Sequence, residues 1–334
     1  MRKLVLLVLC ALLSLPAFGQ TTLNGAGATF PNPMYSKWFS EYSKLHSDVQ
    51  INYQPIGSGG GIRQVTAGTV DFGASDMPMT DKQLSDSKVK ILNIPTVLGA
   101  VVPAYNIPGV SGEIKFTPDA LAGIFLGKIA RWNDKAITST NPGINFPDKE
   151  IIVVHRSDGS GTSFIFTDYL SKVSPEWKAQ VGSDTSVKWP LGMGGKGNEG
   201  VAGYIRQLSG SIGYVELIYA VQNNIPYGVV RNSSGNFVKA SLESVTAAAA
   251  SAPKMPADFR VSITNAPGKE AYPIASFTWL LIPEKSKDAA KGKILQDFLN
   301  WMVNDGQQMT AALTYAPLPQ NVAAKVKEAV KQVK

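Results

Sequence analysis

The stretch Ile151-Ile-Val-Val-His-Arg-Ser-Asp-Gly-Ser-Gly-Thr162 decides the fold of this chain. It joins an apolar run, residues 151–154, to a cluster of Gly, Ser and Thr, and an amphipathic segment with Ile165, Tyr169 and Val173 on one side follows. A continuous apolar run of this kind predicts a strand that is buried on both faces. The order of strand, small polar residues and helix is typical of α/β proteins, so we predict an α/β fold.

Two earlier parts of the chain repeat this design. Residues 25–31 (Gly-Ala-Gly-Ala-Thr-Phe-Pro) follow a predicted strand at 22–24, and residues 57–61 (Gly-Ser-Gly-Gly-Gly) follow one at 49–53. These two segments and residues 158–163 are called the first, second and third Gly-rich segments. Ligands of open α/β sheets bind at the carboxyl ends of strands, where all three are expected to lie.

Amphipathic patterns after the first two Gly-rich segments predict helices. A further short strand is expected at 70–74, ending at Ser75-Asp76, and the Ala-rich residues 246–252 predict a helix end followed by a surface loop. The six tryptophans are expected to pack in the core or the hinge rather than to form a stacking surface. The residues expected on the buried faces are Met34, Trp38, Tyr42 and Leu45 in the first helix and Ile62 and Val65 in the second.

The three Gly-rich segments have the composition of anion sites. The first turn of a helix leaves backbone N–H groups unpaired, and the peptide dipoles favour negative charge there. Small residues let an anion approach the backbone, and Ser and Thr hydroxyls add donors without net charge. Three such segments indicate one small oxyanion held from several sides. Residues 195–198 (Gly-Lys-Gly-Asn) lack the ending of a P-loop, and Gly194, Gly195 and Gly197 are predicted to form a turn.

Charged residues beside these segments point to the kind of anion. Arg156 offers a planar fork of N–H groups for an oxyanion, and Asp158 is placed to orient it, although a surface ion pair is the alternative. Asp76 repels a fully ionised anion but accepts a hydrogen bond from an anion that keeps a proton, as phosphate does near neutral pH. The alternative is that Asp76 only caps the segment from Met77. The sequence leaves both alternatives open.

The first 19 residues have the pattern of a cleavable signal peptide. Arg2 and Lys3 precede an apolar run that is too short to span a membrane, and residues 17–19 (Ala-Phe-Gly) form a small-residue cleavage site. Cys10, the only cysteine, lies in this run, in a context that argues against a lipid anchor. The mature chain is therefore expected to be an exported, soluble protein without thiol chemistry.

Length and charge limit the possibilities further. Removing 19 of the 334 residues leaves 315, enough for two domains. Removing Arg2 and Lys3 from the 32 basic residues leaves 30 against 25 acidic ones, a net charge of +5 without basic runs. This mild excess does not favour nucleic-acid binding.

Two apolar segments flanked by Pro, residues 96–105 and 273–282, are long for single strands. We expect each to cross between lobes, with residues 20–98 plus 280–334 forming lobe I and residues 99–279 forming lobe II. A discontinuous lobe with two crossings predicts a hinged clamshell with a cleft for the ligand.

The motifs together closely resemble the periplasmic phosphate-binding protein family of the phosphate-specific ABC transporter. The resemblance covers essentially the whole mature chain, in the order of the family. It implies a type II periplasmic-binding-protein fold, two α/β lobes joined by a two-segment hinge, and a monomer that binds inorganic phosphate and delivers it to an inner-membrane ABC permease. It also implies a periplasmic location. The matching motifs are residues 25–31, 57–61, 71–76, 121–127 with Trp132, 156–162, 189–190, 194–198, 213–216 and 315–319.

Carried over position by position, the resemblance also implies a ligand set. His155 stands where some relatives carry a second basic residue, and we expect it to lie outside the contacts of the ligand because neighbouring strand residues point to opposite faces. Relatives can have Ser at the position of Gly59, and we expect that the glycine here removes no hydroxyl group that contacts the ligand. The implied phosphate contacts are the Thr29 hydroxyl, the Phe30 N–H, Ser58, Asp76, Arg156, Ser160, Gly161 and Thr162, with Asp158 orienting Arg156.

Other functions remain as alternatives. One alternative is a receptor for sulfate or molybdate, and Asp76 argues against it because a carboxylate favours only a ligand that carries a proton. A secreted phosphatase or a surface adhesin could also use the same fold. A serine hydrolase is disfavoured because Ser160, His155 and Asp158 lie within six residues, whereas triads join separate elements. With two histidines, of which His46 is expected to be an exposed polar residue, we expect no zinc centre, no other metal and no cofactor.

Overall fold

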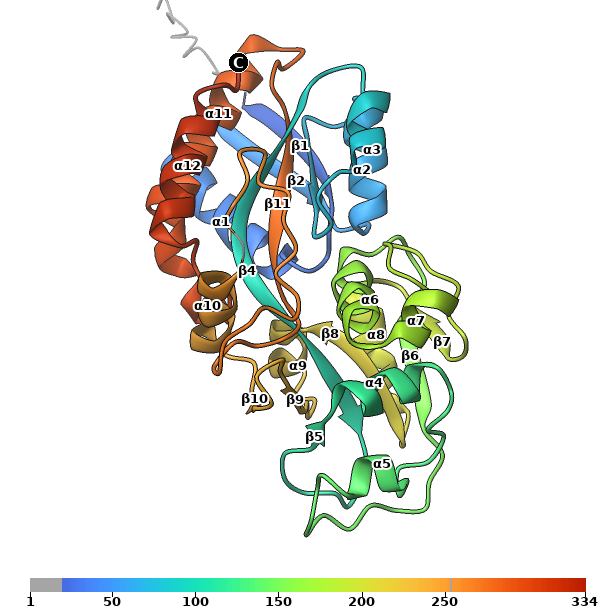
Figure 1. Cartoon of the computed structure of the whole chain (residues 1–334). Coiled ribbons are helices and arrows are strands. Elements are labelled where there is room, and N and C mark those ends of the chain that lie inside the picture. Colours follow the sequence, from blue (N-terminus) through green and yellow to red (C-terminus); the bar gives the residue numbers. More distant parts are fainter. Residues whose placement is uncertain (1–19, 253) are drawn as a thin grey trace, which may run out of the picture.

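The computed structural model describes residues 20–252 and 254–334, so the predicted signal peptide and Cys10 lie outside the described residues. The chain forms two α/β lobes, the upper and lower lobes of Figure 1. The strands are β1 (Thr21–Gly27), β2 (Val49–Gln54), β3 (Phe72–Ser75), β4 (Ile91–Asn106), β5 (Lys115–Phe116), β6 (Ile152–Arg156), β7 (Met193–Gly195), β8 (Ser211–Glu216), β9 (Val229–Arg231), β10 (Phe237–Val238) and β11 (Ala275–Pro283).

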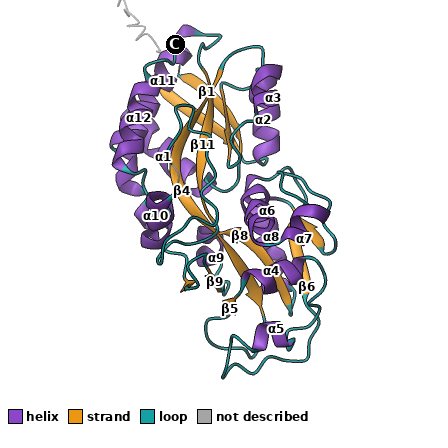
Figure 2. Cartoon of the chain, in the orientation of Figure 1, coloured by secondary structure: helices purple, strands orange, loops and turns teal. Residues whose placement is uncertain are grey.

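Helices surround these strands, and in the upper lobe Figure 2 shows them on both sides of the sheet. The α-helices are α1 (Asn32–Leu45), α2 (Ser58–Ala67), α3 (Asp81–Asp86), α4 (Pro118–Phe125), α5 (Lys135–Thr138), α6 (Gly161–Val173), α7 (Pro175–Gln180), α8 (Gly197–Gln207), α9 (Leu217–Gln222), α10 (Leu242–Ser251), α11 (Ala289–Asn304) and α12 (Gln320–Val330). Two 3-10 helices, η1 (Gly306–Met309) and η2 (Ala311–Leu313), lie between α11 and α12.

One long strand, β4, belongs to both lobes. Within the described residues an eight-stranded sheet has the order β2-β1-β3-β11-β4-β8-β6-β7, and a small sheet has the order β10-β9-β5. Residues 91–100 of β4 pair with β11, whereas residues 101–106 pair with β8. β4 thus connects the lobes, and Figure 1 shows it passing from the upper lobe into the lower.

The second predicted crossing behaves differently. β11 pairs along its whole length with β4 residues 91–100, and its middle also pairs with β3 of the upper lobe. Residues 275–279, which we assigned to lobe II, therefore share a sheet with lobe I. The division into residues 20–98 plus 280–334 and residues 99–279 remains a prediction, and the pairing of β11 indicates that its last boundary falls before Ala275.

The parallel strands explain where loops from distant parts of the chain come together. β1 pairs in parallel with both β2 and β3, and β6 pairs in parallel with both β7 and β8. Their carboxyl ends therefore lie at one edge of each half-sheet. The first Gly-rich segment extends from the end of β1, the second follows β2, Asp76 follows β3, and the third follows β6.

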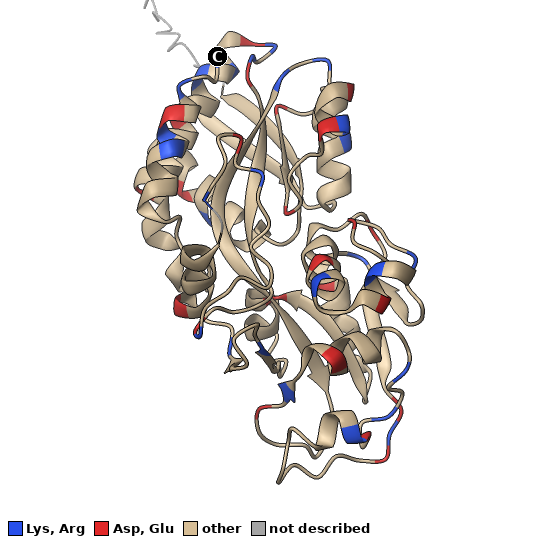
Figure 3. Cartoon of the chain, in the orientation of Figure 1, with Lys and Arg blue, Asp and Glu red and all other residues tan. Residues whose placement is uncertain are grey.

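Most of the predicted core is buried, but Val173, Trp189 and Trp301 are only partly buried, and two residues are exposed. Met34, Trp38 and Tyr42 of α1 are buried, but Leu45 is 66% exposed, because α1 ends there and its last turn extends past the core. The third Gly-rich segment follows β6 as predicted, but Ile152 is 36% exposed, so this strand is not covered on both faces. The predictions that Leu45 and Ile152 are buried were wrong. Figure 3 shows basic and acidic residues scattered over both lobes.

Candidate functional site

The Gly-rich segments of the two lobes meet and form hydrogen bonds with one another. The Gly59 N–H donates to the Gly159 carbonyl at 2.9 Å, and the Gly161 N–H donates to the Ser58 hydroxyl oxygen at 3.0 Å. Gly161 has to be a glycine, because a Cβ there would lie 2.5 Å from the Asp76 Oδ2 and would also clash with the Ser58 hydroxyl. The junction of the lobes therefore brings together residues far apart in sequence.

Asp76 lies at this junction with its carboxyl group buried. Its Oδ1 accepts from the Thr278 hydroxyl at 2.8 Å, and its N–H donates to the Ser58 hydroxyl oxygen at 3.1 Å. Burial raises the pKa of Asp76 to about 7, although the Thr278 hydroxyl, the Arg156 charge and Ser58 act in the opposite direction. Asp76 caps no helix, since α3 begins at Asp81 with Thr80 as its cap, so the capping alternative is wrong.

Arg156 and Asp158 form a buried pair rather than a surface pair. The Arg156 Nε donates to the Asp158 Oδ1 at 2.8 Å and Nη2 donates to Oδ2 at 2.6 Å, and the Arg156 side chain is only 1% exposed. Burial alone would raise the pKa of Asp158, but its hydrogen bonds to Arg156 and to the Gly197 N–H, together with the Arg156 charge, hold it below its usual value. Asp158 thus holds the guanidinium in one orientation, as predicted.

The guanidinium keeps donors for a ligand. Of its five N–H groups, one on Nε, one on Nη2 and one on Nη1 are used, the last donating to the Thr162 hydroxyl at 3.3 Å. The remaining N–H groups of Nη1 and Nη2 have no acceptor among residues 20–252 and 254–334. Two such groups on one planar fork suit two oxygens of a tetrahedral oxyanion.

The backbone around Thr29 and Phe30 is oriented by three tyrosines, two of them buried and one, Tyr53, partly buried. Their hydroxyls donate to three consecutive carbonyl groups, and burial raises the pKa of each tyrosine, so each remains a donor. With these carbonyls held, the N–H groups of Thr29 and Phe30 have no acceptor in the described part of the chain. The pairs are Tyr53 with Ala28 (2.7 Å), Tyr219 with Thr29 (2.6 Å) and Tyr315 with Phe30 (2.6 Å).

The start of α6 provides the remaining predicted contacts. Ser160 caps this helix, since its hydroxyl oxygen accepts from the Ser163 N–H at 3.0 Å. Ser160 and Thr162 are buried at the positive end of the helix dipole, which favours an anion. His155 points elsewhere: its ring stacks on Trp189, with 4.9 Å between ring centroids. The structure therefore brings all eight predicted contact residues and Asp158 to one junction.

Sequence reasoning missed one polar residue of the site, Asn198. Gly194, Gly195 and Gly197, which we predicted to form a turn, instead lie at the end of β7 and the start of α8, so this prediction was wrong. The positive φ of Gly197, 69°, allows the chain to turn sharply into the helix. The Asn198 amide donates to the Thr29 hydroxyl oxygen at 2.8 Å. The signal was present, because Gly-x-Gly-Asn before an amphipathic segment repeats the design of the Gly-rich segments.

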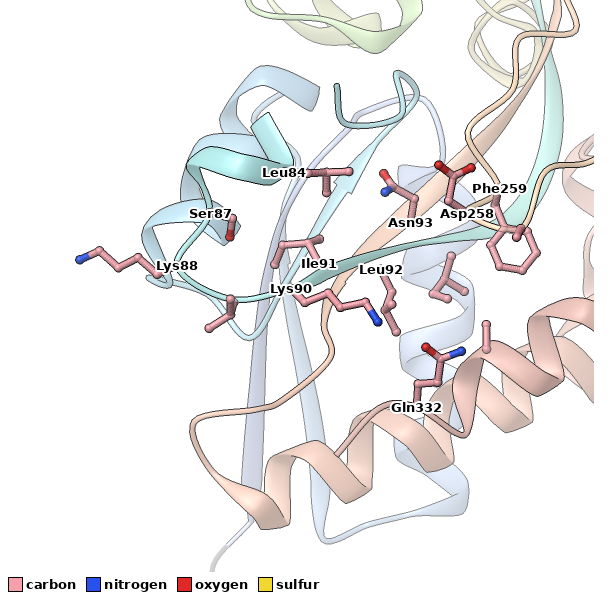
Figure 4. Close-up of a pocket in the computed structure, with 14 residues that line it drawn as sticks. Leu84, Ser87, Lys88, Lys90, Ile91, Leu92, Asn93, Asp258, Phe259 and Gln332 are labelled. Atoms are coloured by element: carbon pink, nitrogen blue, oxygen red, sulfur yellow. The ribbon is translucent and has the colours of Figure 1, made fainter. Parts of the chain in front are cut away.

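A separate surface cavity of about 560 Å³ lies away from this junction, in the upper lobe. Figure 4 shows that its lining combines residues before and along the start of β4 with Phe259 and with Gln332, which follows α12. Lys88 and Lys90 line it, but Lys90 pairs with Glu284. Nothing in this lining repeats the donor arrangement of the Gly-rich segments. In the described residues, no group of three or more His, Cys, Asp or Glu side chains is placed to hold a metal.

The fold and this ring of donors define a two-lobed binding protein with a buried site for a small oxyanion. The sequence matches the PBP superfamily domain over residues 15–306. It is 49% identical over 306 residues to the phosphate-binding protein PstS of Xylella fastidiosa strain Temecula1, covering 91% of this chain and 83% of that protein. It is 46% identical over 327 residues to PstS of Pasteurella multocida strain Pm70, covering 97% and 94%. The chain belongs to the family of PstS phosphate-binding proteins.

Solved structures confirm the fold. A high-affinity periplasmic phosphate-binding protein, PfluDING, bound with phosphate, superposes with a TM-score of 0.73 at 22% identity, over 92% of this chain and 93% of that one. A human phosphate-binding apolipoprotein gives a TM-score of 0.74 at 21% identity over the same shares. The predicted type II periplasmic-binding fold and the predicted family are therefore confirmed.

Proposed function

We propose that this protein is a receptor that holds inorganic phosphate between its two lobes and delivers it to an ABC permease in the inner membrane. Its PstS relatives are named as phosphate-binding proteins, and a structural neighbour was solved with phosphate bound. In this proposal the protein acts as a monomer, and binding with lobe closure is its whole mechanism, without a catalytic step. The phosphate contacts are the eight residues from Thr29 to Thr162 predicted from the sequence.

The proposed location is the periplasm. The basic and apolar N-terminal pattern supports export, and none of the helices in residues 20–252 and 254–334 has the length and apolar character needed to cross a membrane.

The observation that carries the proposal is the buried Asp76 carboxyl group among donors. Arg156, the Gly161 end of α6 and the free N–H groups of Thr29 and Phe30 favour an anion. Asp76 is the exception, because a carboxylate can only accept a hydrogen bond. Phosphate carries a proton near neutral pH and can donate it to Asp76, whereas sulfate and molybdate carry none to donate. These two ions would therefore face the Asp76 carboxylate without a hydrogen bond, or would require Asp76 to be protonated, so we expect both to be disfavoured relative to phosphate.

Isothermal titration of the phosphate-free protein with phosphate, sulfate and molybdate tests this proposal. We expect tight binding of phosphate and no measurable binding of the other two at neutral pH. Incubation with a chromogenic phosphate monoester should release no product. Comparable binding of sulfate or molybdate, or turnover of the ester, would contradict the proposed function.

A further inference from the structure

The amide group of Asn198 connects hydroxyl groups from the two lobes. Its Nδ2 donates to the Thr29 hydroxyl oxygen at 2.8 Å and to the Thr162 hydroxyl oxygen at 3.1 Å. Thr29 follows β1 in the upper lobe, whereas Thr162 lies in the first turn of α6 in the lower lobe. All three side chains are buried, with at most 2% exposure. One amide therefore spends both of its N–H groups on the two threonines.

The orientation of this amide is determined by a third partner. The Glu216 backbone N–H donates to the Asn198 Oδ1 at 2.9 Å. If the amide were turned by 180°, its NH₂ group would face the N–H of Glu216, donor against donor. The oxygen of Asn198 must therefore face Glu216, and its nitrogen must face Thr29 and Thr162.

Each threonine oxygen receives a second N–H group as well. The backbone N–H of Asn198 donates to the Thr29 hydroxyl oxygen at 3.3 Å, and the Arg156 Nη1 donates to the Thr162 hydroxyl oxygen at 3.3 Å. A hydroxyl oxygen has two lone pairs and one proton. With both lone pairs occupied, each hydroxyl can only donate, and its proton has no acceptor in the described part of the chain.

We propose that Asn198 is a positioning residue that turns the Thr29 and Thr162 hydroxyls into obligate hydrogen-bond donors toward the bound anion. The inference rests on the proposed function, because it takes the anion to be phosphate. Asn198 itself acts through the two threonines. A second consequence follows for phosphate: with the two hydroxyls restricted to donation, Asp76 is left as the acceptor for the phosphate proton.

A double-mutant cycle with phosphate titrations tests this role. Asn198→Ala and Asn198→Asp are each measured in the wild-type background and in a Thr29→Val/Thr162→Val background. In the wild-type background we expect Asn198→Ala to weaken binding about tenfold, since residues in one hydrogen-bond network couple by this order. In the valine background, where no hydroxyl remains to be oriented, the same change should alter the dissociation constant by less than about twofold.

Asn198→Asp keeps the size of the side chain and the bond from Glu216, so it remains informative if Asn198→Ala folds poorly. Its second oxygen can only accept, so it should draw the threonine protons away from the anion and weaken binding more than Asn198→Ala does. Part of this loss is simple charge repulsion, which persists in the valine background, whereas the part due to hydroxyl reversal should disappear there.

Asn141→Ala is the matched control, because Asn141 is also buried and its amide donates to the Lys115 and Ile137 carbonyls, away from the Gly-rich segments. It should lower the midpoint of urea unfolding and leave phosphate affinity unchanged. The inference is overturned if the Asn198 variants weaken binding equally in both backgrounds, or if they leave wild-type affinity unchanged. A wild-type protein that fails to bind phosphate would instead overturn the proposed function.

Discussion

The Ser58 hydroxyl oxygen accepts the Gly161 N–H at 3.0 Å, although the two residues stand 103 positions apart and belong to different lobes. The same oxygen accepts the Asp76 N–H at 3.1 Å. Ser58 thus links the second Gly-rich segment, the start of α6 and the residue that carries the buried Asp76 carboxyl group. Because the bond from Gly161 crosses between the lobes, the site is complete only when the lobes are in contact.

The first prediction concerns the buried cation. Arg156→Ala should weaken phosphate binding by about 2–5 kcal/mol, since a charge-assisted pair of hydrogen bonds is lost from a desolvated site. Isothermal titration measures the change. Arg131→Ala is the control, because Arg131 pairs with Asp148 at the surface of the lower lobe and its loss should leave the affinity unchanged. A loss at Arg156 of less than about tenfold (roughly 1.4 kcal/mol) would show that the anion is held elsewhere.

The second prediction concerns selectivity. Asp76→Asn removes the charge and supplies an amide that can donate to an anion oxygen. Sulfate binding should become measurable in this variant, whereas phosphate binding should persist with altered affinity. Competition titrations of both proteins with the two anions provide the measurement, and Asp148→Asn at the surface should change neither. Equal rejection of sulfate by wild type and variant would remove Asp76 as the selective group.

The third prediction concerns stability and pH without phosphate. The pKa of Asp76 is about 7 in the folded protein against an ordinary value of 3.8, so between these values the folded state binds more protons than the unfolded state. Its contribution to stability is full below pH 3.8 and is lost as the pH rises through 7. Asp76→Asn does not titrate, so its unfolding free energy should gain about 4 kcal/mol relative to wild type between pH 4 and pH 8.

Urea unfolding of both proteins at several pH values tests this expectation. A difference between variant and wild type that stays constant across this range would show that Asp76 is ionised in the phosphate-free folded protein.

The fourth prediction concerns the close approach of the lobes. Gly161→Ala places a Cβ against Ser58 and Asp76, which should hold the lobes apart and weaken phosphate binding by at least about 1–3 kcal/mol, the cost of overpacking. Small-angle scattering should show compaction by phosphate in wild type and little in the variant.

The matched control for this change is Gly203→Ala in α8. A Cβ at Gly203 would have no heavy atom within 4 Å, so this variant should keep wild-type affinity and gain about 0.5–1 kcal/mol of stability, because alanine favours a helix. Normal compaction in Gly161→Ala would contradict the importance of this approach.

The fifth prediction concerns the carbonyl contacts of the first Gly-rich segment. Tyr315→Phe leaves the Phe30 carbonyl without its donor and should lower stability by about 1 kcal/mol and phosphate affinity several-fold. Tyr272→Phe removes a similar buried bond to the Val101 carbonyl and should lower stability without changing affinity. Equal affinities for the two variants would show that holding the Phe30 carbonyl does not matter for binding.

Local sequence was enough for the α/β class and for the position of each Gly-rich segment. The apolar run before Arg156 and the small residues after it produce a strand, a tight turn and a helix start with unpaired N–H groups, and these depend on neighbouring residues only. The family could be predicted because its motifs are distributed along the whole chain, and the similarity to PstS proteins confirms it. Leu45 and Ile152 were placed wrongly, since periodicity indicates a face but not how far the core extends along it.

The residues that can donate to an anion follow from the sequence alone, because donor chemistry and helix starts are local properties. The direction in which these donors point and the charge they carry depend on the tertiary structure. The pairing of Asp76 with Thr278 joins residues 202 positions apart, and the contact of Asn198 with Thr29 joins residues 169 positions apart. Such contacts come from strand order and from the meeting of the lobes. Burial at that junction, which raises the pKa of Asp76, exists only when both lobes are folded around it.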